Sequence, residues 1–171
     1  MAEQNMQYKL MVLYMLGKVD FSLTYAHLSD FILGRGYTDY FNLQQTIAEL
    51  TEAGLIHQET LRSTTYYMIT PEGEETIGYF SSRISLAIRE DIDAWLRENR
   101  LAMINDVSMR ADYYRDTSGD YEVRCVIMEK KKDLCDLRLK VSDEAIAKAM
   151  CRQWKTKSQP IYEYLMKELM Q

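Results

Sequence analysis

The sequence predicts an α+β protein with two groups of elements joined by a helix. Between residues 37 and 71, a helical apolar periodicity leads into a glycine and two short β-rich runs. Between residues 107 and 141, three runs alternate apolar and polar residues, which predicts a three-stranded antiparallel meander. Because no glycine or proline occurs from residue 79 to 118, a helix is expected between the two groups.

The expected boundaries follow from these patterns. Residues 1–83 form an N-terminal domain, residues 84–104 a connecting helix, and residues 105–171 a small α+β domain. In the last domain, strands starting at residues 107, 121 and 135 precede two helices. The first helix runs from the Ser142-Asp143-Glu144 cap to about Trp154, and the second begins near Pro160.

Composition indicates a globular protein of the reduced cytoplasm. Of the 171 residues, 47% are hydrophobic and 27% charged, which is ordinary for soluble domains. No apolar run approaches the ~20 residues of a membrane span, and the N-terminus lacks the pattern of a signal peptide. The three cysteines, an odd number, fit a reducing compartment. We therefore expect a cytoplasmic location and no membrane partner.

The first 36 residues predict two helices and a short strand. Residues 4–16 keep an apolar spacing of three to four and form the first helix. Residues 19–21 are expected to form a small strand, and Ser22 or Thr24 caps the second helix. The Gly34-Arg35-Gly36 run ends that helix. With the helix that follows, it forms a helix-turn-helix.

The third helix and the segment after it are the most informative part. Thr38 and Asp39 suit a helix N-terminus, and Leu43, Ile47 and Leu50 share one buried face. Gly54 stops the helix, because glycine adopts the left-handed C′ conformation without strain. Residues 55–60 and 64–70 then read as two strands around a turn at residues 61–63.

Two short motifs in this segment resemble bacterial regulators. The run Ile47–Ile56 (IAELTEAGLI) resembles the L-x-x-L-x-x-x-G-L-I end of a winged-helix recognition helix. The run Ile69–Gly73 (ITPEG) resembles the L-T-P-E-G that closes the wing in PadR-like and MarR-like proteins. The resemblance implies an N-terminal winged helix-turn-helix and a DNA-binding transcriptional regulator.

The whole chain also resembles an uncharacterised family. The runs YTDYFNLQQTIAEL (37–50) and DIDAWLRENR (91–100) are similar to a Firmicutes family that is known only as a domain of unknown function. This second resemblance implies a fold and supplies no mechanism.

Candidate DNA contacts lie on the third helix and at the hairpin tip. Opposite the buried face stand Tyr40, Asn42, Gln45 and Glu49, with Gln44 at the flank. Asparagine and glutamine contact adenine in the major groove, and tyrosine donates to phosphate. Arg62 at the tip is placed for a phosphate or the minor groove. These residues predict double-stranded DNA as a partner; the alternative is an ordinary solvated helix face.

The charge distribution argues against DNA. Residues 1–83 hold five basic and ten acidic residues, so 5 − 10 = −5, whereas residues 84–171 hold 16 of each, so 16 − 16 = 0. Phosphate binding depends on lysine and arginine. A protein-interaction module on the same scaffold, with a protein partner and no DNA, therefore stays open. A weaker alternative is small-molecule sensing by the C-terminal domain.

A long apolar stripe predicts a homodimer. From residue 77 onward, isoleucine and aromatic residues recur at helical spacing for several turns, although Ser81, Ser82 and Ser85 could break the helix. A small N-terminal domain could cover only the start of this stripe. We expect a second copy to pack on the rest, while a compact monomer covered by the C-terminal sheet is the alternative. The expected interface residues are Ile84, Ile88, Ile92 and Trp95.

Motifs for catalysis and metal binding are missing. His27 and His57 have no ligand spacing around them and are expected to be surface or boundary residues. Cys125, Cys135 and Cys151 form no C-x-x-C pair. The sequence has no phosphate-binding glycine loop and no nucleophile elbow. We therefore expect no enzyme activity, no metal and no cofactor. Cys125 and Cys135 are expected to be buried reduced thiols.

Overall fold

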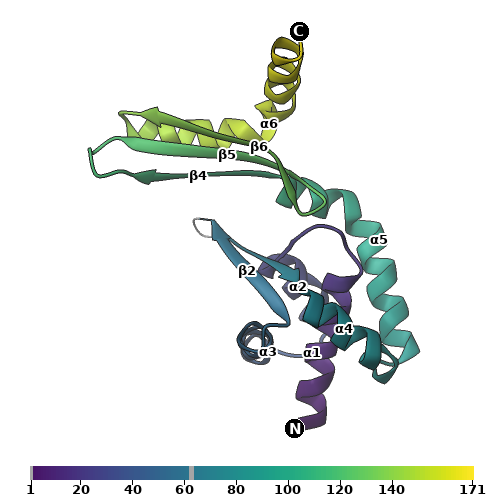
Figure 1. Ribbon diagram of the computed structural model, residues 1–171. Helices are drawn as coiled ribbons and strands as arrows, with labels where there is room; N and C mark the ends of the chain where they lie inside the picture. Colours follow the sequence, from purple (N-terminus) through teal and green to yellow (C-terminus); the bar gives the residue numbers. More distant parts are fainter. Residues whose placement is uncertain (1, 62–63) are drawn as a thin grey trace. The chain divides into compact units, whose positions relative to one another are not determined.

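The computed structural model describes residues 2–61 and 64–171, which divide into two compact units (Figure 1). Unit 1 extends to Ile104 and unit 2 runs from Asn105 to Gln171. Both units combine helices with a three-stranded antiparallel sheet, so the chain is of the mixed α+β class.

Unit 1 is a helical domain with a small sheet. Its elements are α1 (Ala2–Gly17), β1 (Leu23–Thr24), α2 (Tyr25–Ile32), α3 (Tyr40–Glu52), β2 (Ile56–Leu61), β3 (Thr64–Ile69), α4 (Pro71–Phe80), the 3-10 helix η1 (Ser81–Arg83) and α5 (Leu86–Ser108), whose last residues enter unit 2. Strand β3 lies between β1 and β2 and is antiparallel to both. Helix α1 is central, because every residue from Leu10 to Leu16 is buried.

Glycine at the end of α3 makes the turn that the sequence predicted. Gly54 has φ +72°, the N–H of Leu55 donates to the carbonyl of Leu50 at 3.0 Å, and Gly54 N–H donates to Thr51 at 3.1 Å. This pair of hydrogen bonds is the Schellman arrangement, which satisfies the free carbonyls of the last helical turn. It turns the chain directly into β2.

The ITPEG motif joins the end of α3 to the start of α4. Thr70 caps α4, since its hydroxyl accepts from Gly73 N–H at 3.1 Å and donates to the Gly54 carbonyl at 2.7 Å. Pro71 occupies the first helical position, where its missing N–H costs nothing. A Cβ at Gly73 would come within 2.0 Å of the Leu55 carbonyl oxygen. Only glycine fits this close approach.

Three local expectations in unit 1 were wrong. The small strand is Leu23–Thr24 and not residues 19–21. His27 is buried, because its Nδ1 accepts from the backbone N–H of Thr24 in a capping box with that residue. Asp39, not Thr38, caps α3. In each case a side-chain hydrogen bond to the backbone decides the boundary.

A break separates α4 from the expected connecting helix, which is α5. Helix α4 ends at Phe80, η1 follows, and Ile84 is extended with φ −83° and ψ 130°. Helix α5 then starts at Leu86 and continues to Ser108. The serines at residues 81, 82 and 85 mark this break, as the sequence suggested.

Helix α5 packs against the rest of unit 1, so part of its apolar stripe is covered without a second copy. Ile84 and Ile92 are fully buried, whereas Ile88 and Trp95 are half-buried. The Trp95 ring lies 5.5 Å from the ring of Phe31 in α2. Two of the four residues assigned to a dimer interface, Ile84 and Ile92, therefore belong to the core of unit 1, and a dimer stays a prediction.

Hydrogen bonds and one ion pair also hold α5 against the rest of unit 1. The Tyr14 hydroxyl donates to Asp93 at 3.0 Å, and burial together with this carboxylate raises the pKa of Tyr14 to about 12. Tyr37 donates to Asp91 at 2.9 Å, and Arg35 pairs with the same carboxylate at 3.3 Å. Helices α1 and α5, and the turn before α3, are tied together by these contacts.

Unit 2 is the predicted meander with one helix on it. Strands β4 (Met109–Arg115), β5 (Tyr121–Glu129) and β6 (Lys132–Val141) lie in chain order, and α6 (Glu144–Leu169) covers one face. The buried core comprises Val123, Cys125, Ile127, Ala147 and Trp154. The first strand begins at Met109, because residues 107 and 108 still belong to α5.

The expectation of two C-terminal helices was wrong. Pro160 lies inside α6, which continues past it to Leu169. Proline removes one backbone donor and bends a helix without always ending it. Figure 1 shows α6 running along the sheet and then turning away from it near its C-terminal end.

A buried tryptophan anchors α6 to the irregular part of the sheet. The register of β5 and β6 shifts between Ile127 and Met128, which indicates a bulge. Next to it, the indole N–H of Trp154 donates to the Val126 carbonyl at 3.0 Å. The side chain thus fills the core and also satisfies a backbone group beside the bulge.

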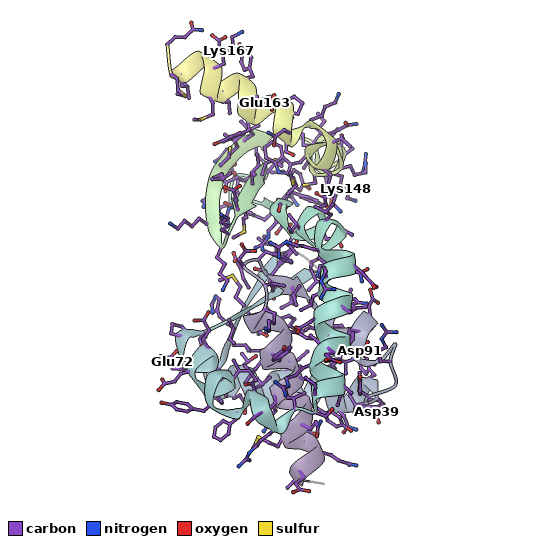
Figure 2. All side chains as sticks on the ribbon, turned by 90° about the vertical axis from the view of Figure 1, so that its right-hand side faces the viewer. Asp39, Glu72, Asp91, Lys148, Glu163 and Lys167 are labelled. Atoms are coloured by element: carbon purple, nitrogen blue, oxygen red, sulfur yellow. The ribbon has the colours of Figure 1, made fainter. Side chains whose placement is uncertain are left out.

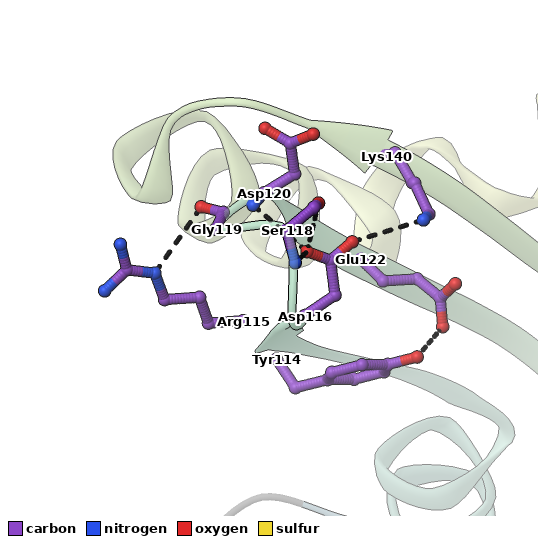
Figure 3. Close-up of polar contacts among 8 residues, drawn as sticks. All are labelled: Tyr114, Arg115, Asp116, Ser118, Gly119, Asp120, Glu122 and Lys140. Atoms are coloured by element: carbon purple, nitrogen blue, oxygen red, sulfur yellow. Dashed lines mark hydrogen bonds and ion pairs between the residues drawn. The ribbon is translucent and has the colours of Figure 1, made fainter.

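The turn between β4 and β5 is built on one carboxylate (Figure 3). Asp116 Oδ1 accepts from the Ser118 N–H at 2.9 Å, the Ser118 hydroxyl at 2.6 Å and the Asp120 N–H at 3.1 Å. Its other oxygen lies 3.2 Å from Lys140 Nζ. These groups, Ser118 first, lower the pKa of Asp116 to about 2. Gly119 supplies the left-handed residue, with φ +93°.

Candidate nucleic-acid interface

Helix α3 presents one buried and one exposed face. Asp39, marked at its start in Figure 2, accepts from the N–H of Asn42 at 2.9 Å and fixes the first turn. The face packed into unit 1 consists of Leu43, Thr46, Ile47 and Leu50. The opposite side of the helix is therefore exposed along its length.

The four predicted α3 residues lie together on this exposed face. Tyr40 is 52% exposed, and Asn42, Gln44 and Gln45 are also exposed. They carry hydroxyl and amide groups, which form hydrogen bonds without adding charge. The fifth predicted residue, Arg62, lies outside the described residues.

Phe41 belongs to the same face and was missed from the sequence. Its side chain is 80% exposed, with the Tyr40 ring 5.6 Å away in an edge contact. Tyr40 in turn lies 6.0 Å from the Tyr25 ring of α2. The sequence could have predicted this exposure. Residues two apart point in nearly opposite directions on a helix, so Phe41 points outward because Leu43 points inward.

One carboxylate toward the C-terminal end of the exposed face is paired. Glu49 Oε2 lies 2.6 Å from Lys9 Nζ of α1, and the Gln45 amide donates to Glu49 Oε1 at 2.9 Å. Lys9 and then Gln45 lower the pKa of Glu49. From Tyr40 to Ala48 the helix has no charged residue. The first half of the face is therefore neutral.

A polar depression of about 270 Å³ adjoins α3. Its lining comes from the first turns of α1 and from α3: Ala2, Gln4, Asn5, Tyr8, Asn42 and Gln45. All these side chains are uncharged. The neutral character of the α3 face thus extends onto the N-terminal end of α1.

The β2–β3 hairpin stands next to α3 in sequence and joins it through Gly54. Residues His57, Gln58, Glu59 and Thr60 of β2 are exposed. Across the hairpin, the hydroxyls of Thr60 and Thr65 lie 3.0 Å apart. The hairpin therefore offers mainly polar groups, with one carboxylate at Glu59.

Unit 1 remains acidic as a whole. Residues 1–104 contain eight basic and 14 acidic residues, so 8 − 14 = −6. Some carboxylates have partners, as Asp91 does with Arg35 and Asp20 does with Arg100 at 3.2 Å. The net charge nevertheless opposes the approach of a polyanion.

The described residues contain no group of three or more His, Cys, Asp or Glu side chains placed to hold a metal ion. Cys125 is buried, as expected, and burial raises the pKa of its thiol to about 11. Cys135 is only half-buried. None of the described helices has the length and apolar character needed to cross a membrane.

Comparison with known proteins identifies a family without a known activity. A family model described as a domain of unknown function, DUF4364, matches residues 8–169. Comparisons with the curated proteins and with the solved structures found no match. Since the matched range covers nearly the whole chain and both units, the protein belongs to the DUF4364 family.

Proposed function

We propose that unit 1 is a winged-helix module that binds double-stranded DNA through the exposed face of α3, and that the protein regulates transcription. The order of elements supports this proposal, since α2, a tight turn and α3 are followed by a two-stranded hairpin. In helix-turn-helix proteins the second helix enters the major groove. Here that helix is α3.

The neutral composition of the α3 face is the observation that carries the proposal. Asn42, Gln44 and Gln45 present the amide groups that pair with adenine edges, and Phe41 presents an apolar ring of the kind that contacts the thymine methyl group. Phe41, 80% exposed, lies beside these amides on the same face of α3. The combination favours A·T base pairs.

The acidic surroundings set the expected affinity. Few cations stand near α3, so few phosphates are neutralised and the slope of log K against log salt should be shallow. Binding should be weak and depend mainly on base contacts. Two linked modules would be needed for high affinity.

Selection from a random duplex library tests the proposal. The full chain, at about 50 mM salt, should enrich A·T-rich duplexes. A Gln44→Ala/Gln45→Ala variant should then lose about tenfold or more in affinity, because a good bidentate pair contributes ~1–3 kcal/mol. Tyr79→Ala, on an exposed position of α4, is the matched control and should bind normally. No enriched duplex, or equal loss in both variants, contradicts the proposal.

The Glu49–Lys9 pair allows a test in the opposite direction. Glu49→Gln removes a negative charge from the α3 face and leaves Lys9 free to meet a phosphate. Affinity for the selected duplex should rise, and the salt slope should steepen by about one phosphate contact. An unchanged affinity would indicate that DNA does not reach this end of α3.

A protein partner is the second candidate, favoured by apolar groups on another surface of unit 1. Tyr79 is 74% exposed and Phe80 is 40% exposed at the end of α4, while Leu86 at the start of α5 is 61% exposed. Should no duplex be selected, this surface becomes the primary candidate. Tyr79→Ala/Leu86→Ala would then be expected to weaken complexes that Gln44→Ala/Gln45→Ala leaves intact.

A further inference from the structure

Strand β6 is the less covered edge of the unit 2 sheet. Strand β5 lies between β4 and β6, so β4 and β6 are the two edges of the meander (Figure 1). Helix α6 packs mainly over β4 and β5. On its outer side β6 pairs with no other described strand. An exposed edge of this kind presents unpaired N–H and C=O groups to a further strand.

The side of β6 that faces α6 is apolar and only partly covered. Residues directly opposite each other in antiparallel strands project to the same face, so Tyr113, Val123 and Leu139 form one row across the sheet. Val123 is fully buried and Tyr113 is half-buried, whereas Leu139 is 48% exposed. Cover therefore decreases toward β6. A strand added beside β6 would cover Leu139 from its open side.

The other side of β6 is charged, and its arginine faces another arginine. Arg138 lies directly opposite Arg124 of β5, and like charges in this arrangement destabilise a sheet. The carboxylate of Asp136 is engaged by Arg124, which donates to it from Nε at 3.1 Å and from Nη2 at 3.0 Å. Among the described residues none forms an ion pair with Arg138. A carboxylate on the open side of Arg138 would offset the repulsion.

We propose that β6 of a second copy pairs antiparallel with β6 about a two-fold axis at Leu137, so that the two meanders form one continuous sheet. With this axis, Arg138 lies directly opposite the partner subunit's Asp136, and the reverse pair forms by symmetry. Both pairs project to the face away from α6, because residues two apart on a strand share a face. The second copy thus supplies a carboxylate on the open side of Arg138.

Charge selects both this register and a second copy as the partner. Moving the axis by one residue places Asp136 or Arg138 opposite its own copy, and like charges directly opposite are destabilising. Charged side chains commonly protect sheet edges, and here they oppose the neighbouring registers while favouring this one. On the apolar side, Leu139 then lies beside the partner subunit's Cys135, and Leu137 meets its own copy.

The expected assembly is a weak, closed dimer. The contact is isologous, so it closes at two copies. Because it involves one strand from each copy, its area places it at the lower end of specific interfaces. Association should therefore depend on concentration. The inference uses only unit 2 and does not rest on the proposed DNA binding.

Molecular mass measured by light scattering on the full chain is the first test. The mass should rise with concentration from the 20.1 kDa of one chain to twice that value. Arg138→Glu places two carboxylates opposite each other at both symmetric positions and should weaken association about tenfold or more. Arg152→Glu makes the same change of charge at an exposed position of α6 and should associate normally.

Stability of the dilute protein separates lost pairing from lost folding. Arg138→Glu removes the like charge opposite Arg124, so the free energy of unfolding of the dilute protein should not fall. Urea denaturation monitored by circular dichroism measures it. An Arg138→Glu chain that unfolds more easily when dilute would show that Arg138 supports its own chain, which contradicts the role assigned to it.

Cysteine crosslinking locates the axis. Residues directly opposite each other have a Cα separation that suits a disulfide, so Leu139→Cys should give a covalent dimer through the partner subunit's Cys135 under mild oxidation. Leu139→Cys/Cys135→Ser should not crosslink, and the native chain is the control for its own three thiols.

Three results would overturn the proposal. The first is a 20.1 kDa species at every concentration, which includes the case that β6 pairs only with a peptide of another protein. The second is a dimer that Arg138→Glu leaves unchanged. The third is crosslinking of Leu139→Cys that persists when Cys135 is replaced.

Discussion

Helices α5 and α6 each carry an apolar stripe, and the two stripes differ in how much of their length is buried. The α5 stripe is covered inside unit 1, where Ile92 is fully buried and Trp95 meets Phe31. In the α6 stripe Trp154 is buried and Tyr162 and Leu165 are half-buried, whereas Leu169 is 79% exposed. Periodicity thus shows that a face requires burial, and it does not identify what buries it.

Truncation of one residue in each stripe should separate the two cases most strongly. Ile92→Ala leaves a cavity in a packed core and should lower the free energy of unfolding by ~2–5 kcal/mol. Leu169→Ala should change it by less than ~0.5 kcal/mol, since that side chain is 79% exposed. Urea denaturation monitored by circular dichroism measures both. Equal losses would show that residue 169 is covered within the monomer.

Trp154→Phe tests how the covered half of α6 is held. The substitution keeps an aromatic ring and removes the N–H that donates to Val126. A buried carbonyl left without this donor costs ~1–3 kcal/mol, to which a small loss of packing adds. Chemical denaturation of the full chain should show this loss. A neutral substitution would mean that water replaces the indole donor.

Hydrogen exchange should show the boundary between the two halves directly. Backbone amides of residues 166–169 should exchange much faster than those of residues 147–158, since all four side chains are exposed. Uniform protection along α6 would contradict a difference in cover between its two halves.

Acid should affect unit 2 locally and weakly. The pKa of Asp116 lies below its usual value of 3.8, at about 2, so its contribution to stability is full above pH ~4 and is lost as the pH falls through ~2. NMR signals of Ser118 and Asp120 should report this loss. In Asp116→Asn the transition should be absent, and a transition that persists would assign it to another carboxylate.

The sequence allowed much of the fold to be predicted, because its turns depend on local chemistry. Gly54 and the Thr70–Gly73 run set the path from α3 to α4, and both were recognised. The continuity of α6 was not, since Pro160 removes a donor whose loss a helix can absorb by bending. The hydrogen bond from Trp154 to Val126, next to the bulge, joins residues 28 positions apart and left no local signal.

The candidate site was also predicted only in part, because helical spacing gives the exposed positions but not the contacts between distant residues. The exposed positions of Tyr40, Asn42, Gln44 and Gln45 follow from helical spacing alone. Phe41 was overlooked because phenylalanine usually lies in a core. The Lys9–Glu49 contact joins residues 40 positions apart, so the neutralised charge on α3 became visible only in the structure.

Photocrosslinking tests the central claim, that DNA lies on α3, most directly. A selected duplex with 5-iodouracil in place of thymine carries iodine where the methyl group stood, and such bases crosslink to nearby aromatic side chains. If DNA lies on α3, the crosslinked peptide should contain Tyr40 and Phe41, and its yield should fall in Phe41→Ala. Crosslinks confined to peptides outside α3 and the β2–β3 hairpin would contradict it.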